Sequence, residues 1–135
     1  MILSIIVPVY NEVESLPFFY DRLTRAFGQI ANIQPEFVFV DDGSNDGSFQ
    51  WLSKLIDEDH GVRVIKLSKN FGSYIALRAG LACASGDAAV MLSADLQDPP
   101  ELIAEMINKW REGYDVVWAV RRAPPGATKW RTGSA

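Results

Sequence analysis

Short apolar runs alternate with longer segments of helical periodicity along most of this chain. The apolar runs cover residues 3–9, 37–41, 62–67, 88–92 and 116–120. Continuous apolar runs of this length are typical of parallel strands that are buried on both faces. Their alternation with helical segments is typical of strand-helix-strand units. The sequence therefore predicts an α/β fold with a mainly parallel sheet of five strands, flanked by four helices.

The helical segments are not all alike. Apolar side chains recur at helical spacing in residues 16–30, 49–56 and 102–110. Ser15 ahead of Pro17 is a plausible start for the first of these helices, and Gly113 fits the end of the last. Residues 73–85 are rich in Ala and Gly, so this helix can lie close to the sheet or to a ligand. Periodicity is lost after Val120, and we expect residues 123–135 to form a polar tail.

Composition excludes several classes of function. The formal net charge of the 135 residues is −4 and no Lys/Arg run is present, which argues against nucleic acid as a partner. No apolar stretch approaches the roughly 20 residues of a membrane-spanning helix, and no signal peptide is recognisable. Cys83 is the single cysteine, so no internal disulfide forms. We expect it to be a small core residue in a reducing compartment.

Polar residues follow every predicted strand. They occupy residues 8–12, 41–48, 68–72, 93–98 and 121–122. Ligands of open parallel sheets bind beyond the carboxyl ends of the strands. Each of these segments alone is also explained by ordinary turn chemistry. Together they predict a single binding rim.

Two of these segments carry groups suited to a nucleoside. Asp41 and Asp42 offer acceptors for its imino and hydroxyl donors. The alternative is an Asx turn that caps the next helix. Tyr10 can stack on a base, although packing explains a tyrosine at a strand end nearly as well.

The remaining segments suit phosphate and metal. Lys69 and Asn70 precede the Ala/Gly-rich helix, whose amino end favours an anion, and Arg78 is a weaker candidate. Arg121 and Arg122 are forked donors for phosphate, or an ordinary exposed pair. Residues 90–101 run from an apolar strand into acids, amides and two prolines, which indicates a site for Mg2+ or Mn2+ and diphosphate. The alternative is a polar turn with Pro99 starting a helix.

Four motifs in this order carry a resemblance to a known family. They are Ile-Val-Pro-Val-Tyr-Asn-Glu at 6–12, Val-Asp-Asp-Gly-Ser at 40–44, Leu-Ser-Lys-Asn-Phe-Gly at 67–72 and Ala-Asp-Leu-Gln-Asp-Pro-Pro-Glu at 94–101. The chain resembles family 2 glycosyltransferases of the GT-A fold, most closely the polyprenyl-phosphate sugar transferases related to dolichyl-phosphate mannose synthase. The resemblance implies a Rossmann-like GT-A nucleotide-sugar-binding domain over residues 1–122. Residues 123–135 would then begin an acceptor-side segment that is cut short.

The resemblance also implies roles for individual residues. Asp42 is the first choice for contact with the base, Lys69 and Asn70 face the diphosphate, and Asp95 and Asp98 are the catalytic candidates. Asp95 aligns with the last acid of the family's Asp-x-Asp signature, and Gln97 can join it on Mg2+ or Mn2+. Ser93 stands where the first acid is expected, so metal affinity should fall unless Asp98, water or the phosphates of the donor complete the ligand set. The full set implied for the nucleotide-sugar is Pro8, Tyr10, Glu12, Asp41, Asp42, Lys69, Asn70, Ala94, Asp95 and Arg121.

The implied reaction transfers a sugar, with inversion, from a UDP- or GDP-linked donor to a polyprenyl phosphate at the cytoplasmic face of a membrane. Membrane contact would require segments absent from this sequence, and we expect the chain to bind its donor but to transfer poorly alone. A polysaccharide or protein acceptor and a binding-only module are the rival readings. A receiver-like module is less compatible, because its paired acids would follow the first strand rather than the second.

Overall fold

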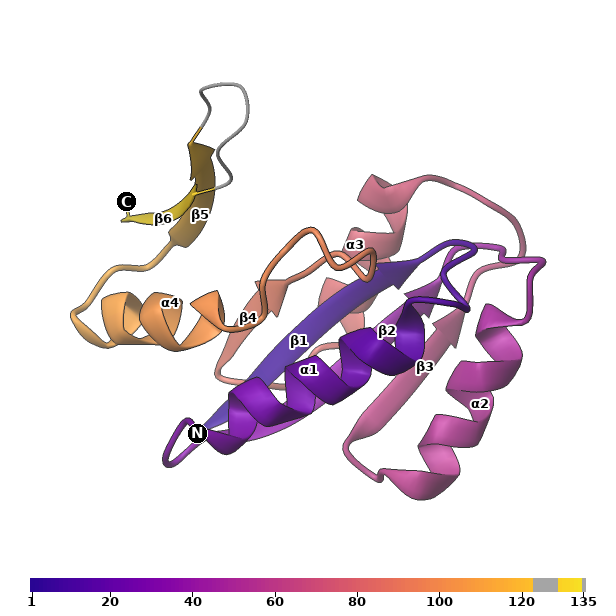
Figure 1. Ribbon diagram of the computed structural model, residues 1–135, viewed down its shortest axis with the longest axis horizontal. Coiled ribbons are helices and arrows are strands. Elements are labelled where there is room, and N and C mark those ends of the chain that lie inside the picture. The colour runs from indigo at the N-terminus through magenta and orange to yellow at the C-terminus, as the bar shows by residue number, and fades with distance from the viewer. Residues whose placement is uncertain (123–128, 135) are drawn as a thin grey trace. The chain divides into compact units, whose positions relative to one another are not determined.

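The computed structural model describes residues 1–122 and 129–134, and the chain divides into two compact units, Met1–Asp98 and Pro99–Ala135. The first unit contains four strands and three helices in strict alternation (Figure 1). In chain order these are β1 (Ile2–Val9), α1 (Leu16–Gly28), β2 (Gln34–Asp41), α2 (Ser48–Glu58), β3 (Val62–Lys66), α3 (Ser73–Cys83) and β4 (Ala88–Met91). The predicted alternation of strands and helices is therefore confirmed in this unit.

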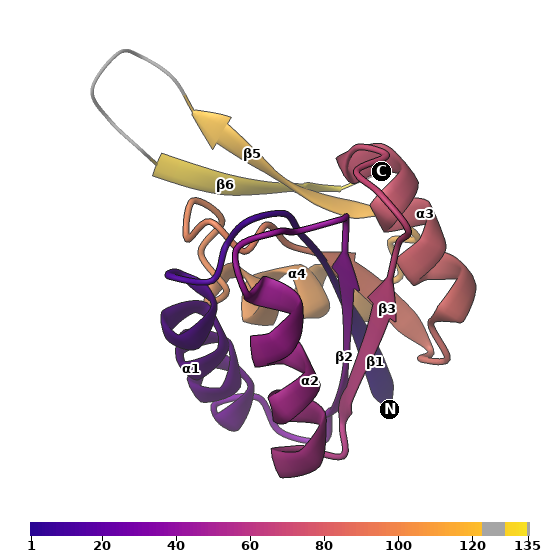
Figure 2. The same cartoon turned by 90° about the vertical axis from the view of Figure 1, so that its right-hand side faces the viewer.

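The four strands form one sheet in the order β3-β2-β1-β4, and all neighbours are parallel. Ile6 at the centre of β1 lies between Val38 of β2 and Met91 of β4. Figure 2 shows α1 and α2 on one side of this sheet and α3 on the other. A parallel sheet with helices on both faces is the predicted α/β architecture.

The core lies around β1 and β2. The side chains of Ile5, Ile6, Val7 and Phe39 have no exposed surface, and burial of each such side chain stabilises the fold by about 1.5–3 kcal/mol. On the other face of the sheet, a Cβ added to Gly80 of α3 would collide with the Ile6 side chain. The small residues of α3 therefore let its backbone lie against the sheet, as the sequence predicted.

The second unit does not extend the parallel sheet. It contains α4 (Leu102–Arg111) and an antiparallel pair, β5 (Val117–Arg122) and β6 (Lys129–Ser134). The prediction that residues 116–120 supply a fifth strand to the parallel sheet is wrong, because this strand pairs with β6 instead. Within the predicted polar tail, Lys129–Ser134 forms the strand β6. Residues 123–128 and 135 of the predicted tail lie outside the described residues.

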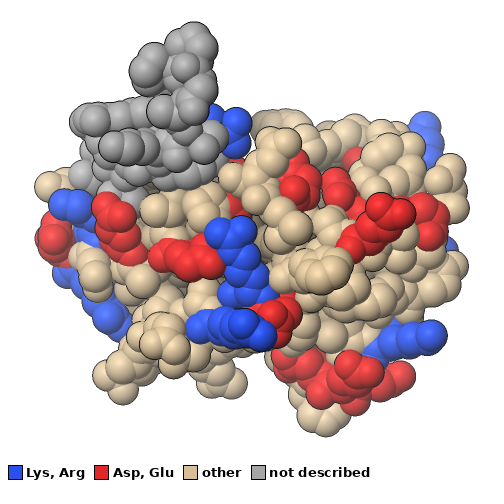
Figure 3. Space-filling model, in the orientation of Figure 1, with Lys and Arg blue, Asp and Glu red and all other residues tan. Residues whose placement is uncertain are grey.

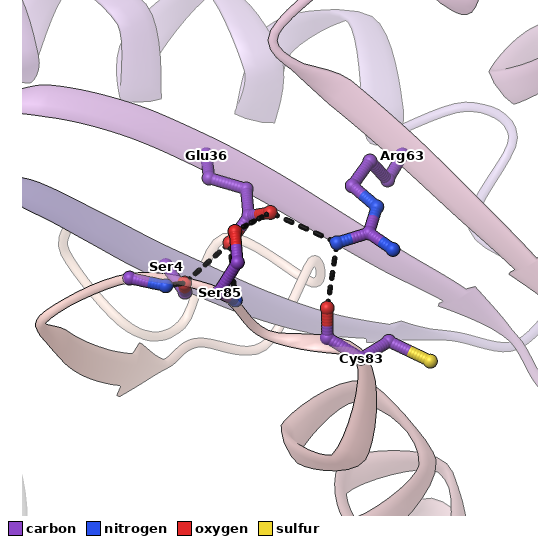
Figure 4. A network of polar contacts seen from close by, with 6 residues as sticks. Ser4, Glu36, Arg63, Cys83 and Ser85 are labelled. Carbon is purple, nitrogen blue, oxygen red and sulfur yellow. Dashed lines mark hydrogen bonds and ion pairs between the residues drawn. The ribbon is translucent and has the colours of Figure 1, made fainter.

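A polar cluster of Ser4, Glu36, Arg63 and Ser85 lies at the amino edge of the sheet (Figure 4). The Glu36 carboxylate accepts hydrogen bonds from the hydroxyl of Ser4 at 2.5 Å, the hydroxyl of Ser85 at 2.7 Å, the backbone N–H of Ser85 at 3.0 Å and Nη1 of Arg63 at 3.0 Å. Burial alone would raise the pKa of Glu36, but these donors together lower it to about 2. We call these four residues the amino-edge cluster.

The amino-edge cluster also corrects an expectation about Cys83. The cysteine is exposed at the end of α3, and its backbone carbonyl accepts a hydrogen bond from Arg63 at 2.6 Å. It is therefore not the core residue that its small neighbours suggested. Small residues around it reflect the packing of the opposite face of α3 against the sheet.

Two further features are the distribution of charged side chains on the surface and the length of the helices. On the face shown in Figure 3, Lys and Arg side chains are interspersed with Asp and Glu. Within residues 1–122 and 129–134, no helix combines the length and the apolar character that crossing a bilayer requires.

Candidate active site

Four segments meet at the carboxyl edge of the parallel sheet. They are residues 10–15 after β1, 41–48 at the end of β2, 67–72 after β3 and 92–98 after β4, and we call them the carboxyl rim. Parallel strands place these ends at one edge, where ligands of such sheets bind. Four of the five polar segments that the sequence predicted are therefore brought together. The fifth, with Arg121 and Arg122, belongs to β5 in the other sheet.

The first two segments of the rim are joined by hydrogen bonds. The backbone N–H groups of Asn11 and Glu12 donate to the hydroxyls of Ser44 at 2.9 Å and Ser48 at 3.0 Å. The side-chain oxygen of Asn11 in turn accepts the N–H of Asn45 at 2.9 Å. Asn11 has φ of 51°, a left-handed conformation that asparagine tolerates better than most residues. The two segments therefore form one rigid surface.

Asp46, which is exposed, also holds this surface together. Its carboxylate accepts the hydroxyl of Ser48 at 2.6 Å and the backbone N–H groups of Ser48 and Val13 at 3.0 and 3.2 Å. Burial alone would raise its pKa, but these donors lower it overall. A local turn, in which Asp46 accepts the N–H of Ser48, is thus present at residues 44–48, while the cap position of α2, Gly47, makes no side-chain capping hydrogen bond. Only one oxygen of Asp41, Oδ2, takes part in this turn, by accepting the N–H of Ser44.

Asp41 differs from every other acid of the rim. Its side chain is fully buried at the end of β2. One oxygen, Oδ2, accepts the N–H of Ser44 at 3.3 Å, while Oδ1 has no hydrogen-bond partner within the described residues. Leaving a buried acceptor unsatisfied costs about 1–3 kcal/mol. Such an atom in a native structure calls for an explanation, and a ligand that donates a hydrogen bond is one.

Asp42 is also buried, but both of its oxygens are engaged. Oδ1 accepts the N–H of Phe71 at 2.8 Å and Oδ2 accepts the N–H of Gly72 at 3.0 Å. The sequence placed Asp42 first among contacts to a base and did not anticipate these two donors. They come from the segment after β3, so Asp42 joins the second and third segments of the rim.

Lys69 and Asn70 lie exposed on that third segment, next to the start of α3 at Ser73. The Lys69 ammonium lies 5.1 Å from the centroid of the Phe71 ring. A cation close to a helix amino end provides a favourable field for an anion. Lys69 and Asn70, which the sequence predicted to face a phosphate, therefore lie at the rim.

The fourth segment folds on itself. The Asp98 carboxylate accepts the N–H of Ser93 at 3.0 Å, and the Asp95 carboxylate accepts the N–H of Gln97 at 3.0 Å. Leu96 between them has φ of 65°, which is unfavourable for a leucine. Asp95 and Gln97 are exposed. Asp98 closes this loop and does not start a helix, since α4 begins at Leu102 with Glu101 as its cap position.

Ser15 links the first and fourth segments. Its hydroxyl lies 2.8 Å from a carboxylate oxygen of Glu12 and 3.0 Å from the backbone carbonyl of Ala94. The sequence indicated Ser15 only as a helix start, and it does hold the cap position of α1 without a capping hydrogen bond from its side chain. The one sequence signal for the link that Ser15 makes was its small polar side chain at a helix cap position near two of the motifs.

Comparison with known proteins identifies the family. The sequence profile of glycosyl transferase family 2 matches residues 4–134. The chain is 41% identical over 134 residues to the bactoprenol glucosyl transferase of Shigella phage SfV, covering 98% of this chain and 43% of that protein. It is 44% identical over 119 residues to the undecaprenyl-phosphate 4-deoxy-4-formamido-L-arabinose transferase of Yersinia pestis, covering 87% of this chain and 36% of that protein. The chain belongs to glycosyl transferase family 2.

A solved structure agrees with this family at the level of the fold. The mannosyltransferase PcManGT from Pyrobaculum calidifontis, in complex with GDP-Man and Mn2+, superposes with a TM-score of 0.69 at 23% identity, over 89% of this chain and 35% of that one. The GT-A architecture expected from the sequence is therefore confirmed. The chain spans less than half the length of each of these proteins.

Family membership raises the question of a metal. No group of three or more His, Cys, Asp or Glu side chains able to hold an ion occurs in the part of the chain that the structure describes. Asp95 nevertheless offers an exposed carboxylate, with the amide of Gln97 two residues away. Mg2+ at phosphate-transfer sites is commonly held by one or two carboxylates, with phosphate oxygens and water completing its shell. The donor set therefore fits a metal that is shared with a bound diphosphate.

Proposed function

We propose that this chain is the donor-binding part of a glycosyltransferase that moves a sugar from a nucleoside-diphosphate sugar to a polyprenyl phosphate. The observation that carries the proposal is the unpartnered Oδ1 of Asp41, buried at the rim where ligands of this fold bind. Membership of glycosyl transferase family 2 supplies the reaction class. The names of two relatives, one a bactoprenol transferase and the other an undecaprenyl-phosphate transferase, support a polyprenyl acceptor.

The nucleoside would lie between the first two segments of the rim. Asp41 accepts a hydrogen bond from the base or the ribose, because its Oδ1 is the acceptor that the fold leaves without a donor. Tyr10 has 47% of its surface exposed and is available to stack on a base. Pro8 and Glu12 flank this position at the end of β1. A uridine or a guanosine both present the donors that such a carboxylate requires.

The diphosphate would lie toward the third and fourth segments. Lys69 and Asn70 contribute a cation and an amide, and Asp95 with Gln97 holds Mg2+ or Mn2+ against the phosphate oxygens. When bound, the metal supplies charge that stabilises the departing diphosphate. The hydrogen bond from the Ser15 hydroxyl to the backbone carbonyl of Ala94 holds the loop that carries Asp95 in position. The role of Arg121, on β5, in binding phosphate stays a prediction from the sequence.

The chemistry needs little help from a base. An oxygen of the acceptor phosphate attacks the anomeric carbon, and the bond from that carbon to the nucleoside diphosphate breaks on the opposite face, which inverts the configuration. A phosphate monoester is already largely ionised near neutral pH, since its second pKa is about 6. One oxygen of the Asp98 carboxylate already accepts the N–H of Ser93. We therefore assign it to the shape of the loop rather than to proton transfer.

The complete reaction is proposed for a longer protein of the dolichyl-phosphate mannose synthase type, acting at the cytoplasmic face of a membrane. The chain matches only 36–43% of the length of the two relatives described above. We propose that the 135 residues bind donor and metal, and that the acceptor site requires further sequence. Turnover of lipid phosphate by the purified chain at the rate of a full-length relative would contradict this division.

The test is calorimetric titration of UDP and GDP into the purified chain, with Mn2+ and again with EDTA. Binding of one of the two nucleotides that weakens about tenfold or more in EDTA is the expected result. Asp95→Ala should remove this metal dependence. Asp57→Ala, an exposed acid near the far end of α2, is the charge-matched control and should bind as the parent chain does. Absence of binding by both nucleotides would overturn the proposed function.

A further inference from the structure

Asp41 and Asp42 are adjacent in sequence, but they meet different partners. The Asp42 side chain is only 3% exposed, and its two oxygens accept the consecutive N–H groups of Phe71 and Gly72 at 2.8 and 3.0 Å. Hydrogen bonds to an ionised carboxylate are roughly twice as strong as neutral ones. A carboxylate that accepts two consecutive backbone donors fixes the chain at that point.

Gly43 gives a second, independent indication of the same coupling. It has φ of +77°, and a Cβ added to it would lie 2.5 Å from the carbonyl carbon of Lys69 and 3.0 Å from the Lys69 Cα. The turn that follows Asp42 therefore rests directly on the backbone of Lys69 and Asn70. Only glycine combines this conformation with so close an approach.

These two contacts enclose the residues proposed to face the diphosphate. Gly43 lies against the backbone of Lys69 and Asn70, and Asp42 holds the N–H groups of the next two residues, Phe71 and Gly72. The amino end of α3 has Gly72 at its cap position, with φ of 97° and no side-chain cap of its own. Asp42, from a neighbouring strand end, accepts the N–H groups of Phe71 and Gly72 immediately before the helix. The conformation of residues 69–72 thus depends on a residue 27 or more positions earlier in the chain.

We infer that Asp42 is a positioning residue: its carboxylate sets the conformation of residues 69–72 and, through them, the contacts to the donor diphosphate, while Asp41 alone serves the nucleoside. This inference rests on the proposed function. It assigns different parts of the donor to two neighbouring acids that the motif presents as equivalent. Removal of each acid should therefore weaken binding of a different part of the ligand.

The experiment compares the affinities of a nucleoside monophosphate and the corresponding diphosphate, with Mn2+, for the chain and its variants. In Asp42→Asn, an amide N–H2 faces a backbone N–H, so one of the two hydrogen bonds is lost. We expect diphosphate affinity to fall roughly tenfold and monophosphate affinity to change less than about twofold. In Asp41→Asn the two affinities should fall by the same factor. Gly43→Ala, which displaces the same loop, should reproduce the pattern of Asp42→Asn.

A cycle with Lys69→Ala separates positioning from a general loss of structure. If Asp42 acts through the loop, the effect of Asp42→Asn on diphosphate affinity should largely disappear in the Lys69→Ala background. Equal loss of monophosphate and diphosphate affinity in Asp42→Asn would overturn the inference, and would indicate that Asp42 contacts the nucleoside. Unchanged affinity for both ligands would overturn it as well.

A measurement on the unaltered chain covers the case in which Asp42→Asn does not fold. Amide hydrogen exchange of Phe71 and Gly72 should slow on addition of the diphosphate and not on addition of the nucleoside. Equal slowing by both ligands, or by neither, would overturn the inference while leaving the proposed function intact. Failure of the unaltered chain to bind any nucleotide would overturn both.

Discussion

The two edges of the parallel sheet differ in how completely they supply hydrogen-bond donors to their carboxylates. At the amino edge, Glu36 accepts four hydrogen bonds from Ser4, Ser85 and Arg63 (Figure 4). At the carboxyl edge, Asp41 is fully buried, whereas Glu36 is only partly buried, and yet Asp41 keeps one oxygen without a partner in the described residues. The first arrangement stabilises the fold. The second costs stability, and a ligand that donates a hydrogen bond would offset this cost.

The difference extends to the surroundings of each acid. The amino-edge cluster ties the connection between α3 and β4 to β1 and β2 through hydrogen bonds within the fold. The carboxyl rim also has internal ties through Asp42, Asp46 and Asp98, yet it leaves Lys69, Asn70 and Asp95 exposed. The acids with hydrogen-bond partners hold the rim in shape, and we propose that the ligand binds at Asp41, whose Oδ1 has no partner within the described residues.

The largest expected effect is on binding at the carboxyl edge. Asp41→Asn keeps the volume of the side chain and removes its charge, so nucleotide affinity should fall about 30- to 100-fold. Thermal stability should change little, because the altered atom makes no hydrogen bond in the fold. Calorimetry and thermal unfolding measure the two quantities on one preparation. If this variant bound the nucleotide with the affinity of the parent chain, the proposed difference between the two edges of the sheet would be contradicted.

Glu36→Ala should show the reverse pattern. Removal of this carboxylate leaves Ser4 and Ser85 without their acceptor, and we expect the free energy of unfolding to drop by about 2 kcal/mol. Nucleotide affinity, measured well below the new unfolding temperature, should stay within about twofold of the parent value. Chemical denaturation provides the stability. A variant that keeps its stability and loses affinity would mean that the amino edge participates in binding.

The pH dependence of stability sharpens the same contrast. The pKa of Glu36 is about 2 in the fold, below its ordinary value of 4.5. A lowered carboxyl pKa contributes stability that is complete above the ordinary value and is lost as pH falls toward the folded one. The stability advantage of the parent chain over Glu36→Gln should therefore be constant above about pH 5 and shrink between pH 4.5 and 2. Denaturation curves at several pH values test this, and an advantage that grows on acidification would contradict it.

The smallest expected effect concerns Ser15, which joins two segments of the carboxyl rim. Ser15→Ala should cost about 1 kcal/mol of stability, the typical value of one hydrogen bond. Metal-dependent nucleotide affinity should fall a few-fold, because the loop that carries Asp95 loses its tie to α1. Ser53→Ala in α2, whose hydroxyl also donates to a backbone carbonyl, is the matched control. A larger affinity loss in the control would show that Ser15 has no special place at the rim.

The fold of the first unit was predictable because its information is local. Apolar runs such as Ile5–Val9 have no polar side chain that could face water, so they can only be buried strands. The partner of residues 117–122 was not predictable in this way. Lys129–Ser134 has a mixed composition that gives no strand signal, and its pairing with β5 depends on contacts between segments rather than on pattern.

The candidate site was predictable in position and less so in detail. Strand ends placed Asp41, Lys69 and Asp95 at one edge, since parallel connectivity determines which ends meet. The different partners of Asp41 and Asp42 could not be read from the sequence, because they depend on the path of residues 67–72 in space. Cys83 was misjudged for a similar reason, since small neighbours reveal close packing of a helix but not which face packs.

The most direct test of which edge binds the donor is a map of backbone amide chemical shifts in the labelled chain during titration with UDP or GDP and Mn2+. Changes concentrated in residues 10–15, 41–48, 67–72 and 92–98, with Ser4, Glu36, Arg63 and Ser85 unchanged, are the predicted result. Changes centred on the amino-edge cluster, or spread evenly over both edges, would contradict the assignment of the ligand to the edge where Oδ1 of Asp41 has no partner among the described residues.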